Sequence, residues 1–391
     1  MPRRRPELAE QRKAAGFTQA SLAAAMGVDR GTVRRWEAGE NNPLPHERPR
    51  LAERLRVTPD RLAALLGSPS DTPATLLDEL DRTRRRIDDT LSTGTVTRSR
   101  VALIDERVAE HIALYTRTAP AEMLESMVSD LLEVEGLTAV RQPTLLQGRL
   151  SEALAVLASL TADACMKLGD VRRSAHWHGS ARLAADDTEN TRLQAMVRAQ
   201  AAMLPYYYGA AQDAVKLARE AQAVHGEVCD ATALACAAEA RALARYDPTA
   251  AEEARRRAEV MFDRLGTTSD DAFRFNRKRY LLYMSGVLTN MGDIANAQPV
   301  QDEALRLYGG DSGLVIDPAL IRLDQAVGLA VAGDATVACD LAWSVADELC
   351  AEHRTRIVLT RAGDVLRALP APSQSLPRAV ELHAAITTRP Q

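Results

Sequence analysis

The sequence predicts an all-α protein in which a small basic helical domain precedes a long array of helical repeats. Hydrophobic residues make up 46% of the chain but aromatic residues only 4%, and alanine is abundant. This composition suits closely packed helices, because strands favour aromatic and β-branched residues. From Val101 onward nearly every segment carries apolar residues at helical spacing, and turns built on Gly or Asp interrupt the pattern at regular intervals.

The length and the charge distribution indicate more than one domain. A chain of 391 residues is too long for one ordinary core. Residues 1–70 hold 13 Arg and Lys against 8 Asp and Glu, a formal charge of +5, whereas the rest holds 36 against 45, a charge of −9. A basic domain on an acidic remainder fits contact with DNA through the basic domain alone.

Residues 18–39 are the most informative segment of the basic domain, and they predict two short helices joined by a tight turn. Thr18 is a hydroxyl-bearing N-cap, and Leu22 and Met26 lie on one face of the helix that follows. Gly27 ends this helix, since a residue without a Cβ adopts the left-handed conformation at little cost. Ala23 is small where the two helices approach each other.

The second helix of the pair is expected to have one buried and one positively charged face. Asp29 caps it, and Val33 and Trp36 are three residues apart, as a docked helix requires. The outward face carries three arginines, Arg30, Arg34 and Arg35. A short helix with an electropositive face can enter the major groove of DNA.

At these residues the chain resembles the XRE family of phage Cro/repressor-type helix-turn-helix proteins. The resemblance continues at Leu8, Arg12, Gly16-Phe17, Trp36 to Gly39, Asn42-Pro43 and Leu51 to Ser68. It implies a five-helix DNA-binding domain over residues 1–67, with a double-stranded DNA operator as its ligand. Arg12 and Glu37 align with an ion pair of the family that ties the first helix to the end of the recognition helix.

The resemblance also assigns DNA contacts to positions in this domain. Gln19 aligns with a residue that hydrogen-bonds a backbone phosphate, while Arg30, Gly31 and Arg35 align with positions that reach base edges. Because Gly31 has no side chain, readout there would come from its neighbours or from DNA shape. The full set of expected DNA-contacting residues is Gln19, Arg30, Gly31, Thr32, Arg34 and Arg35. The alternative is that the arginines form only a solvated face.

A linker is expected between the basic domain and the repeats. Residues 67–75, GSPSDTPAT, are rich in Gly, Ser, Pro and Asp, and a helical pattern runs from Ala74 to Leu91. We therefore expect a linker with one helix over residues 68–100. At the start of the chain, MPRRRP predicts either a basic arm along a phosphate backbone or a tail.

Helix, short turn, helix recurs five times in the remainder of the chain. The turns are marked by Gly169, Gly209, Asp247, Gly292 and Gly333, at spacings of 40, 38, 45 and 41 residues. Three of these glycines are followed, twelve residues later, by Ala181, Ala221 and Ala304. Gly followed by Ala at this distance resembles the tetratricopeptide (TPR) repeat, although the period exceeds the usual length of about 34 residues.

The second resemblance implies a TPR-like helical-repeat superhelix over residues 101–391. Stacked helix pairs build a superhelix whose concave side is a binding surface. In outline, the chain resembles bacterial peptide-sensing regulators that join an XRE-type domain to a TPR body. In those regulators, asparagines on inner helices clamp a short peptide.

A polar and aromatic stripe on one predicted helix, Phe273 to Asn290, is the candidate ligand site of the repeat domain. Asn276, Tyr280, Tyr283, Val287 and Asn290 recur at spacings of 4, 3, 4 and 3 and would share one face. Amides at both ends can pair with a peptide backbone, and Arg279 nearby can meet a carboxylate. The expected ligand-binding residues are Asn276, Tyr280, Tyr283, Asn290 and Arg279. The alternative is that these polar residues satisfy one another between repeats.

The sequence shows no motif for catalysis, for a cofactor or for a metal. The phosphate-binding GxxxxGK, the GxSxG nucleophile elbow and HExxH are all absent, so we expect neither an enzyme nor a cofactor. The five cysteines show no CxxC pair or zinc spacing. With no signal peptide and no apolar run of about 18 residues, the chain is expected to be cytoplasmic, without a membrane partner.

Together these features predict a sequence-specific DNA-binding transcriptional regulator. Its repeat domain would form a homodimer and bind a short peptide or a small-molecule effector that modulates operator binding. The alternative is a regulator whose repeat domain docks a partner protein without any small effector.

Overall fold

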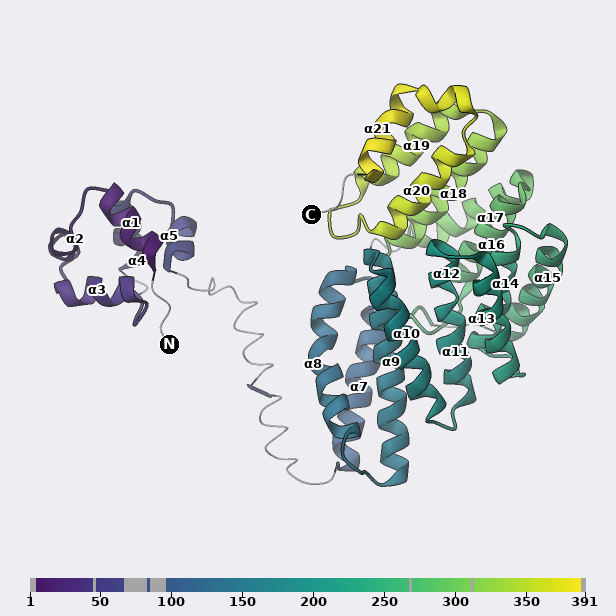
Figure 1. Cartoon of the computed structure of the whole chain (residues 1–391), viewed down its shortest axis with the longest axis horizontal. Coiled ribbons are helices and arrows are strands. Elements are labelled where there is room, and N and C mark those ends of the chain that lie inside the picture. The colour runs from purple at the N-terminus through teal and green to yellow at the C-terminus, as the bar shows by residue number, and fades with distance from the viewer. Residues whose placement is uncertain are drawn as a thin grey trace. The chain divides into compact units, whose positions relative to one another are not determined.

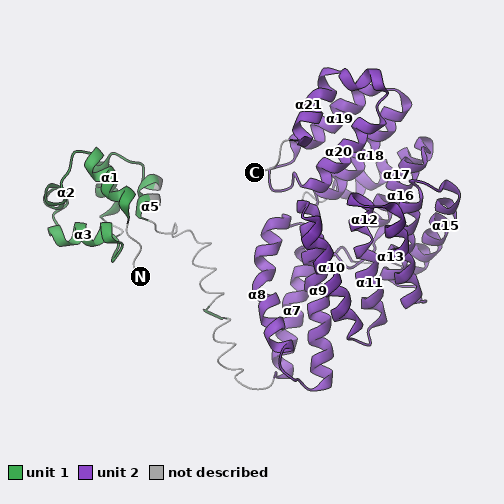
Figure 2. Cartoon of the chain, viewed as in Figure 1, with its two compact units in different colours: residues 1–94 green, residues 95–391 purple. Residues whose placement is uncertain are grey.

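The computed structural model describes residues 5–44, 47–66, 83–84, 96–266, 269–310 and 313–387, and within these ranges it holds helices and no strand (Figure 1). The all-α prediction is confirmed. The chain divides into two compact units, residues 1–94 and residues 95–391 (Figure 2), which we name the head and the body. The helix predicted from Ala74 to Leu91 lies outside the described residues, apart from residues 83–84. None of the described helices combines the length and the apolar character needed to span a bilayer.

The head contains the five helices that the resemblance implies. They are α1 (Pro6–Ala14), α2 (Gln19–Met26), α3 (Arg30–Ala38), α4 (Arg48–Leu55) and α5 (Pro59–Leu66). Their apolar faces meet in one small core, in which Trp36 and Leu55 are 2% and 0% exposed. The predicted core positions of the two-helix motif are all buried: Leu22, Ala23, Met26, Val33 and Trp36.

Local signals set the ends of α2 and α3 as predicted. Thr18 and Ser21 form a capping box, in which each side chain accepts the backbone N–H of the other residue. Gly27 ends α2 in the left-handed conformation, with a φ of 73°. The Asp29 side chain then accepts the Thr32 N–H at the start of α3. These caps define the turn between the two helices.

The body is a succession of helix pairs joined by short turns (Figure 1). Its first half comprises α7 (Arg98–Leu114), α8 (Pro120–Thr138), α9 (Thr144–Leu168), α10 (Val171–Asp186), α11 (Thr191–Ala201), α12 (Met203–Tyr208) and α13 (Ala211–Val224). The second half comprises α14 (Asp230–Leu243), α15 (Pro248–Leu265), α16 (Arg277–Met291), α17 (Ile294–Tyr308), α18 (Ile316–Ala332), α19 (Ala335–Glu348), α20 (Arg356–Ala368), the 3₁₀ turn η1 (Ala371–Ser375) and α21 (Pro377–Thr387).

The five predicted turn markers all lie between paired helices, which confirms the helical repeat. Gly169, Gly292 and Gly333 end α9, α16 and α18 with φ values of 86°, 75° and 98°, which glycine adopts at little cost. Asp247 instead caps the start of α15, and Gly209 has an extended backbone after α12. The three alanines that follow the marker glycines, Ala181, Ala221 and Ala304, are 0% exposed.

One helix begins later than predicted. α16 starts at Arg277 rather than at Phe273, because Asn276 has an extended backbone and its side chain accepts the Arg279 N–H as an N-cap. Residues 269–276 instead form a loop that reaches α7, where the Ala272 N–H donates to the Ile112 carbonyl over 3.2 Å.

Candidate functional site

The outward face of α3 carries the three predicted arginines. Arg30, Arg34 and Arg35 are exposed, while Val33 and Trp36 on the opposite face are 1% and 2% exposed in the head core. Burial of that face fixes α3 on the head and leaves the guanidinium groups in solvent. An arginine in this position can contact O6 and N7 of one guanine together.

Arg35 is held by a chain of hydrogen bonds along α3. Its Nη2 donates to Thr32 Oγ1 over 3.0 Å, and Thr32 Oγ1 donates to Asp29 Oδ2 over 2.5 Å. The hydrogen bond from the Thr32 side chain lowers the pKa of Asp29, so the carboxylate stays ionised. Arg35 Nη2 lies 3.7 Å from Asp29 Oδ2. Thr32 and Asp29 therefore restrict the directions in which Arg35 can point.

Gly31 has a structural role in the same cap. A Cβ at position 31 would lie 2.7 Å from Asp29 Oδ1. A larger residue would displace the carboxylate that caps α3. A side chain at position 31, which the resemblance places among the base-reading positions, would therefore require the Asp29 carboxylate to shift.

Gln19 and Arg12 meet on one carboxylate near the end of α3. Arg12 Nε donates to Glu37 Oε1 over 2.6 Å, and Arg12 Nη1 donates to the Phe17 carbonyl over 2.7 Å. The ion pair implied by the resemblance is therefore present. Gln19 Nε2 donates to Glu37 Oε2 over 2.7 Å. The contact of Gln19 with a DNA phosphate stays a prediction. The amide has a second N–H, which could donate to that phosphate.

Sequence reasoning missed the role of Arg5. Its guanidinium donates to the carbonyls of Trp36 and Asn41 over 2.8 and 2.9 Å, and also to the Asn42 side chain. Arg5 therefore fastens the start of α1 to the C-terminal end of α3. Neither a free arm nor a tail describes this residue, while residues 1–4 lie outside the described ranges.

A second candidate site lies inside the body. Side chains from α9, α11, α12, α14, α16, α18 and α20 surround a cavity of about 60 Å³, together with Tyr115 after α7 and Ala272 in the loop before α16. We name this cavity the central chamber. Residues from helices that are far apart in the sequence line it, from α9 to α20.

Arg241 on α14 is a buried cation of the central chamber. The residue is 4% exposed, and its guanidinium carbon lies 4.1 Å from the ring centroids of both Tyr206 and Tyr283. Burial opposes the charged form, but the neighbouring tyrosines outweigh it and raise the pKa of Arg241, so the group stays charged. Gly286 on α16 makes room for the Arg241 stem, since a Cβ there would lie 2.8 Å from Arg241 Cδ.

Asp163 on α9 is a buried carboxylate of the same chamber. Lys167 Nζ lies 2.9 Å from its Oδ2, and the Tyr115 hydroxyl donates to the same oxygen. Burial opposes ionisation of Asp163, but Lys167 and the Tyr115 hydroxyl outweigh it and lower the pKa of this carboxyl. Its other oxygen, Oδ1, has no hydrogen-bond partner among the described residues.

The structure divides the predicted ligand-binding stripe into two groups. Tyr283 and Arg279 line the central chamber. The other three residues, Asn276, Tyr280 and Asn290, lie outside its lining. Tyr280, Tyr283 and Asn290 keep their helical spacing on α16, and Phe275 contacts both tyrosines. Asn276 is not part of this helix, because it precedes α16 as its N-cap.

Tyr280 and Asn290 each contact an aromatic residue of another helix. Tyr280 stacks on Phe262 of α15, with the ring centroids 4.4 Å apart. Asn290 Nδ2 donates to the Tyr206 hydroxyl over 3.1 Å. Asn290 thus supports one of the two rings that flank the Arg241 guanidinium.

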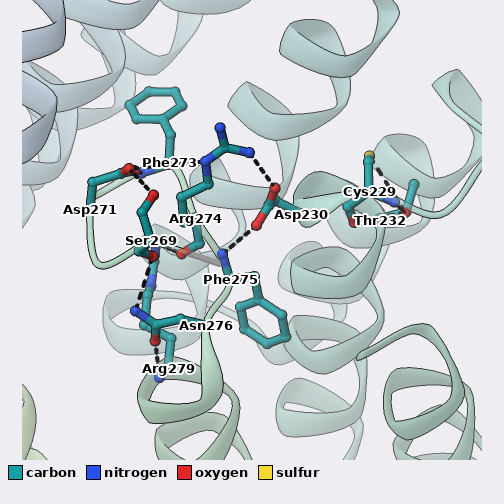
Figure 3. Close-up of polar contacts among 10 residues, drawn as sticks. All are labelled: Cys229, Asp230, Thr232, Ser269, Asp271, Phe273, Arg274, Phe275, Asn276 and Arg279. Carbon is teal, nitrogen blue, oxygen red and sulfur yellow. Dashed lines mark hydrogen bonds and ion pairs between the residues drawn. The ribbon is translucent and has the colours of Figure 1, made fainter. Parts of the chain in front are cut away.

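Asn276 belongs to a loop that polar contacts hold in place (Figure 3). Its Oδ1 accepts the Arg279 N–H over 3.1 Å. Asp230 at the start of α14 accepts the Phe275 N–H over 2.7 Å and a hydrogen bond from Arg274 Nη1 over 3.0 Å. The loop is therefore fastened both to α16 and to α14.

Sequence reasoning also missed Arg241 and Asp163. Each is a charged residue within an alanine-rich stretch. Such a pattern predicts that the charged residue occupies a half-exposed position on a helix. The structure buries α14 on every side from Ala231 to Leu243, so that Arg241 has no route to the surface along its own helix. α14 also carries Glu239, and α9 also carries Arg149, Glu152 and Lys167, so the charge pattern of neither helix distinguishes these two residues.

Comparisons with known proteins bear on the head. Residues 8–62 match the model of a helix-turn-helix family, so the head contains a helix-turn-helix domain. No curated protein matches the chain. Among solved structures, the chain is similar to the crystal structure of Bacillus thuringiensis PlcR in complex with the peptide PapR7 and DNA, at 13% identity over 66% of this chain and 94% of that chain. The TM-score of 0.28 shows that the two chains do not superimpose as a whole.

Proposed function

We propose that the chain is a sequence-specific DNA-binding transcriptional regulator, in which the head binds an operator and the body dimerises and binds an effector. One observation carries the proposal. α3 presents Arg30, Arg34 and Arg35 to solvent from a helix whose other face is buried in the head core by Val33 and Trp36. The match of residues 8–62 to a helix-turn-helix family supports it.

The size of α3 fits the major groove. An α-helix with its side chains is about 10–12 Å in diameter, and the groove is about 12 Å wide, so the nine residues of α3 can lie in it. In this proposal Arg30 and Arg35 contact base edges and Arg34 contacts phosphate. Thr32 orients Arg35, and Gln19 at the start of α2 hydrogen-bonds a backbone phosphate. Gly31 leaves the backbone of α3 uncovered on this face.

Homodimerisation follows from the small number of base contacts that one head can make. Two heads related by a two-fold axis bind half-sites about 34–36 Å apart, or multiples of that distance. We propose that the two chains of the dimer associate through their bodies. As a DNA-binding regulator, the protein is expected to act in the cytoplasm.

A short peptide, the other effector that the sequence leads us to expect, would bind elsewhere on the body. The central chamber is the proposed site of a small-molecule effector. A ligand there contacts helices from both ends of the body, and therefore favours one arrangement of the repeats. Such a ligand changes operator affinity only by the difference between its affinities for the two arrangements. Of the residues expected to bind ligand, Tyr283 and Arg279 lie at the chamber.

Operator selection with the full chain tests the DNA-binding part of the proposal. Random duplexes are selected at low and at physiological ionic strength, and the enriched sequences are compared. We expect a two-fold symmetric operator whose affinity falls steeply with salt. Failure to enrich any sequence at low ionic strength would overturn the proposal.

Screening of culture extracts tests the effector part. A low-mass fraction that raises the melting temperature of the full chain supports an effector. A retained protein partner, with no stabilising low-mass fraction, supports docking of a partner protein instead.

A further inference from the structure

The contents of the central chamber indicate the chemical class of the effector, an inference that rests on the proposed function. We propose that the chamber binds a small monocarboxylate. Its carboxylate accepts hydrogen bonds from the Arg241 guanidinium, and its short apolar tail packs against Leu282, Ile316 and Leu320, which line the same cavity.

Arg241 is buried without a hydrogen-bond acceptor among the described residues. A guanidinium carries five N–H donors in one plane. The rings of Tyr206 and Tyr283 lie 4.1 Å from its central carbon and provide cation–π contacts, but they do not replace acceptors for the N–H groups. Among the described residues no hydrogen bond to the guanidinium is present, and Arg241 Nε is buried and unpaired.

The charge balance of the lining also favours an anionic ligand. Three cations and two carboxylates line the chamber, which leaves a formal charge of +1: Lys167, Arg241 and Arg279 against Asp163 and Asp317.

Each of the other charged groups of the lining has at least one partner, although Asp163 Oδ1 is unpaired among the described residues. Lys167 lies 2.9 Å from Asp163, and Asp317 accepts a hydrogen bond from the Tyr308 hydroxyl over 3.0 Å. Arg279 Nη1 donates to two backbone carbonyls over 2.7 and 2.9 Å. Arg241 is thus the cation of the lining that has no hydrogen-bond acceptor among the described residues, although Asp324, which pairs with Arg361, also raises its pKa. A ligand with one negative charge neutralises the formal charge of the lining.

Size also favours a small ligand. A cavity of about 60 Å³ is smaller than a cavity of about 150 Å³, which holds one benzene molecule. It has room for a carboxylate with a short aliphatic tail, and it is too small for a peptide. A planar carboxylate accepts two parallel hydrogen bonds from a guanidinium. Its single negative charge matches the formal charge of +1 of the lining, which the second charge of a phosphate would exceed.

The test compares matched ligands on the DNA-free full chain. Titration calorimetry with sodium acetate, propionate and butyrate is set against acetamide, propionamide and butyramide, with sodium chloride at equal ionic strength and inorganic phosphate as further arms. We expect at least one carboxylate to bind saturably and at least tenfold more tightly than the amide of the same length. Equal affinity for acid and amide, no binding by any of the three acids, or tighter binding of phosphate would overturn the proposal.

Variants of Arg241 locate the contact. Arg241→Met should abolish the preference for the acid over the amide, and Arg241→Lys, which keeps the charge and the stem but not the planar fork, should reduce it about fivefold or more. Arg256→Met on α15 is the control, since Arg256 is 71% exposed and pairs with Glu252. If Arg241→Met does not fold, the acid preference of Arg241→Lys tests the contact instead. An unchanged acid preference in that variant contradicts the assigned contact.

The ligand titration and the operator selection can refute the carboxylate inference and the proposed function independently of each other. A chain that selects an operator and binds none of the acids refutes the carboxylate inference and leaves DNA binding in place. A chain that binds an acid through Arg241 and selects no DNA refutes the proposed function.

Discussion

Arg12 on α1 and Glu37 on α3 form an ion pair in the head, with Nε and Oε1 2.6 Å apart and side chains 8% and 11% exposed. The other Glu37 oxygen accepts a hydrogen bond from Gln19 over 2.7 Å. One carboxylate therefore connects the first helix, the start of α2 and the end of α3. The stability of the head and the position of its expected phosphate contact depend on the same group.

Replacement of Arg12 by Met should destabilise the head strongly. Glu37 would keep only Gln19 as a partner, so the free energy of unfolding of the head should fall by about 3 kcal/mol. Urea unfolding of the full chain measures it, followed by Trp36 fluorescence in a background with Trp177→Phe and Trp343→Phe.

Arg61→Met is the matched control for this prediction. The Arg61–Glu7 pair is 3.6 Å long with side chains 57% and 68% exposed, and its loss should change stability by less than about 0.5 kcal/mol. Equal effects of the two substitutions would show that the Arg12–Glu37 pair adds nothing beyond a surface contact.

Two substitutions on the surface that is expected to face DNA should have different effects on operator binding. Arg35→Ala should relax the preference at one base pair of each half-site, with a loss of about 1–3 kcal/mol of discrimination. Gln19→Ala should weaken binding to all sequences alike, because a phosphate contact carries no sequence information. Competition binding against all single-base-pair variants of the selected operator separates the two. Unchanged preference in Arg35→Ala would mean that α3 sits in the groove in another register.

The features of the head that were predictable are those set by near neighbours. Thr18, Gly27 and Asp29 act within one helical turn, and their caps form as predicted. The clamp by Arg5 was not predictable, because the carbonyls of Trp36 and Asn41 are more than thirty residues away. Nothing in MPRRRP distinguishes this arginine from its neighbours.

The body shows the same division between local and long-range effects. Its turns and small alanines were predictable from their spacing, whereas the central chamber depends on the assembly of many helices. Arg241 is a buried cation of the chamber because Tyr206 and Tyr283 flank its guanidinium and Gly286 makes room for its stem. Those three residues belong to two other helices, and no spacing along the chain reveals that they meet.

Asn276→Ala tests whether this residue serves the fold or a ligand. Its side chain caps α16, so we expect a loss of about 1 kcal/mol in the stability of the body. Asn276→Asp, which keeps an N-cap acceptor, should stay close to the native value, and the exposed Asn296→Ala is the matched control. Unfolding in urea followed by circular dichroism measures the change. Unaltered stability of Asn276→Ala, together with loss of the effector response, would instead support the ligand contact that its sequence pattern predicts.

His178 on α10 should make the stability of the body depend on pH. The residue is 7% exposed, and neither ring nitrogen has a hydrogen-bond partner among the described residues. Burial lowers the pKa of His178 from 6.5 to about 4, although the charge of Asp163 opposes this shift. Between these two values the unfolded chain binds a proton that the folded body does not. Stability is therefore fully present above pH 6.5 and is lost as the pH falls toward 4.

Unfolding free energies at pH 7.5 and pH 5.0 measure this contribution. Because His178 should account for about 2 kcal/mol of the difference, His178→Leu should reduce the difference by that amount. This interval lies above the range in which carboxyls such as Glu239 and Asp163, whose pKa values are lowered, take up protons. His176→Leu, an exposed position on the same helix, should retain the native pH dependence. If His178→Leu retains it as well, the imidazole must be protonated in the folded body at pH 5, and water must reach it through the packing of α9 and α10.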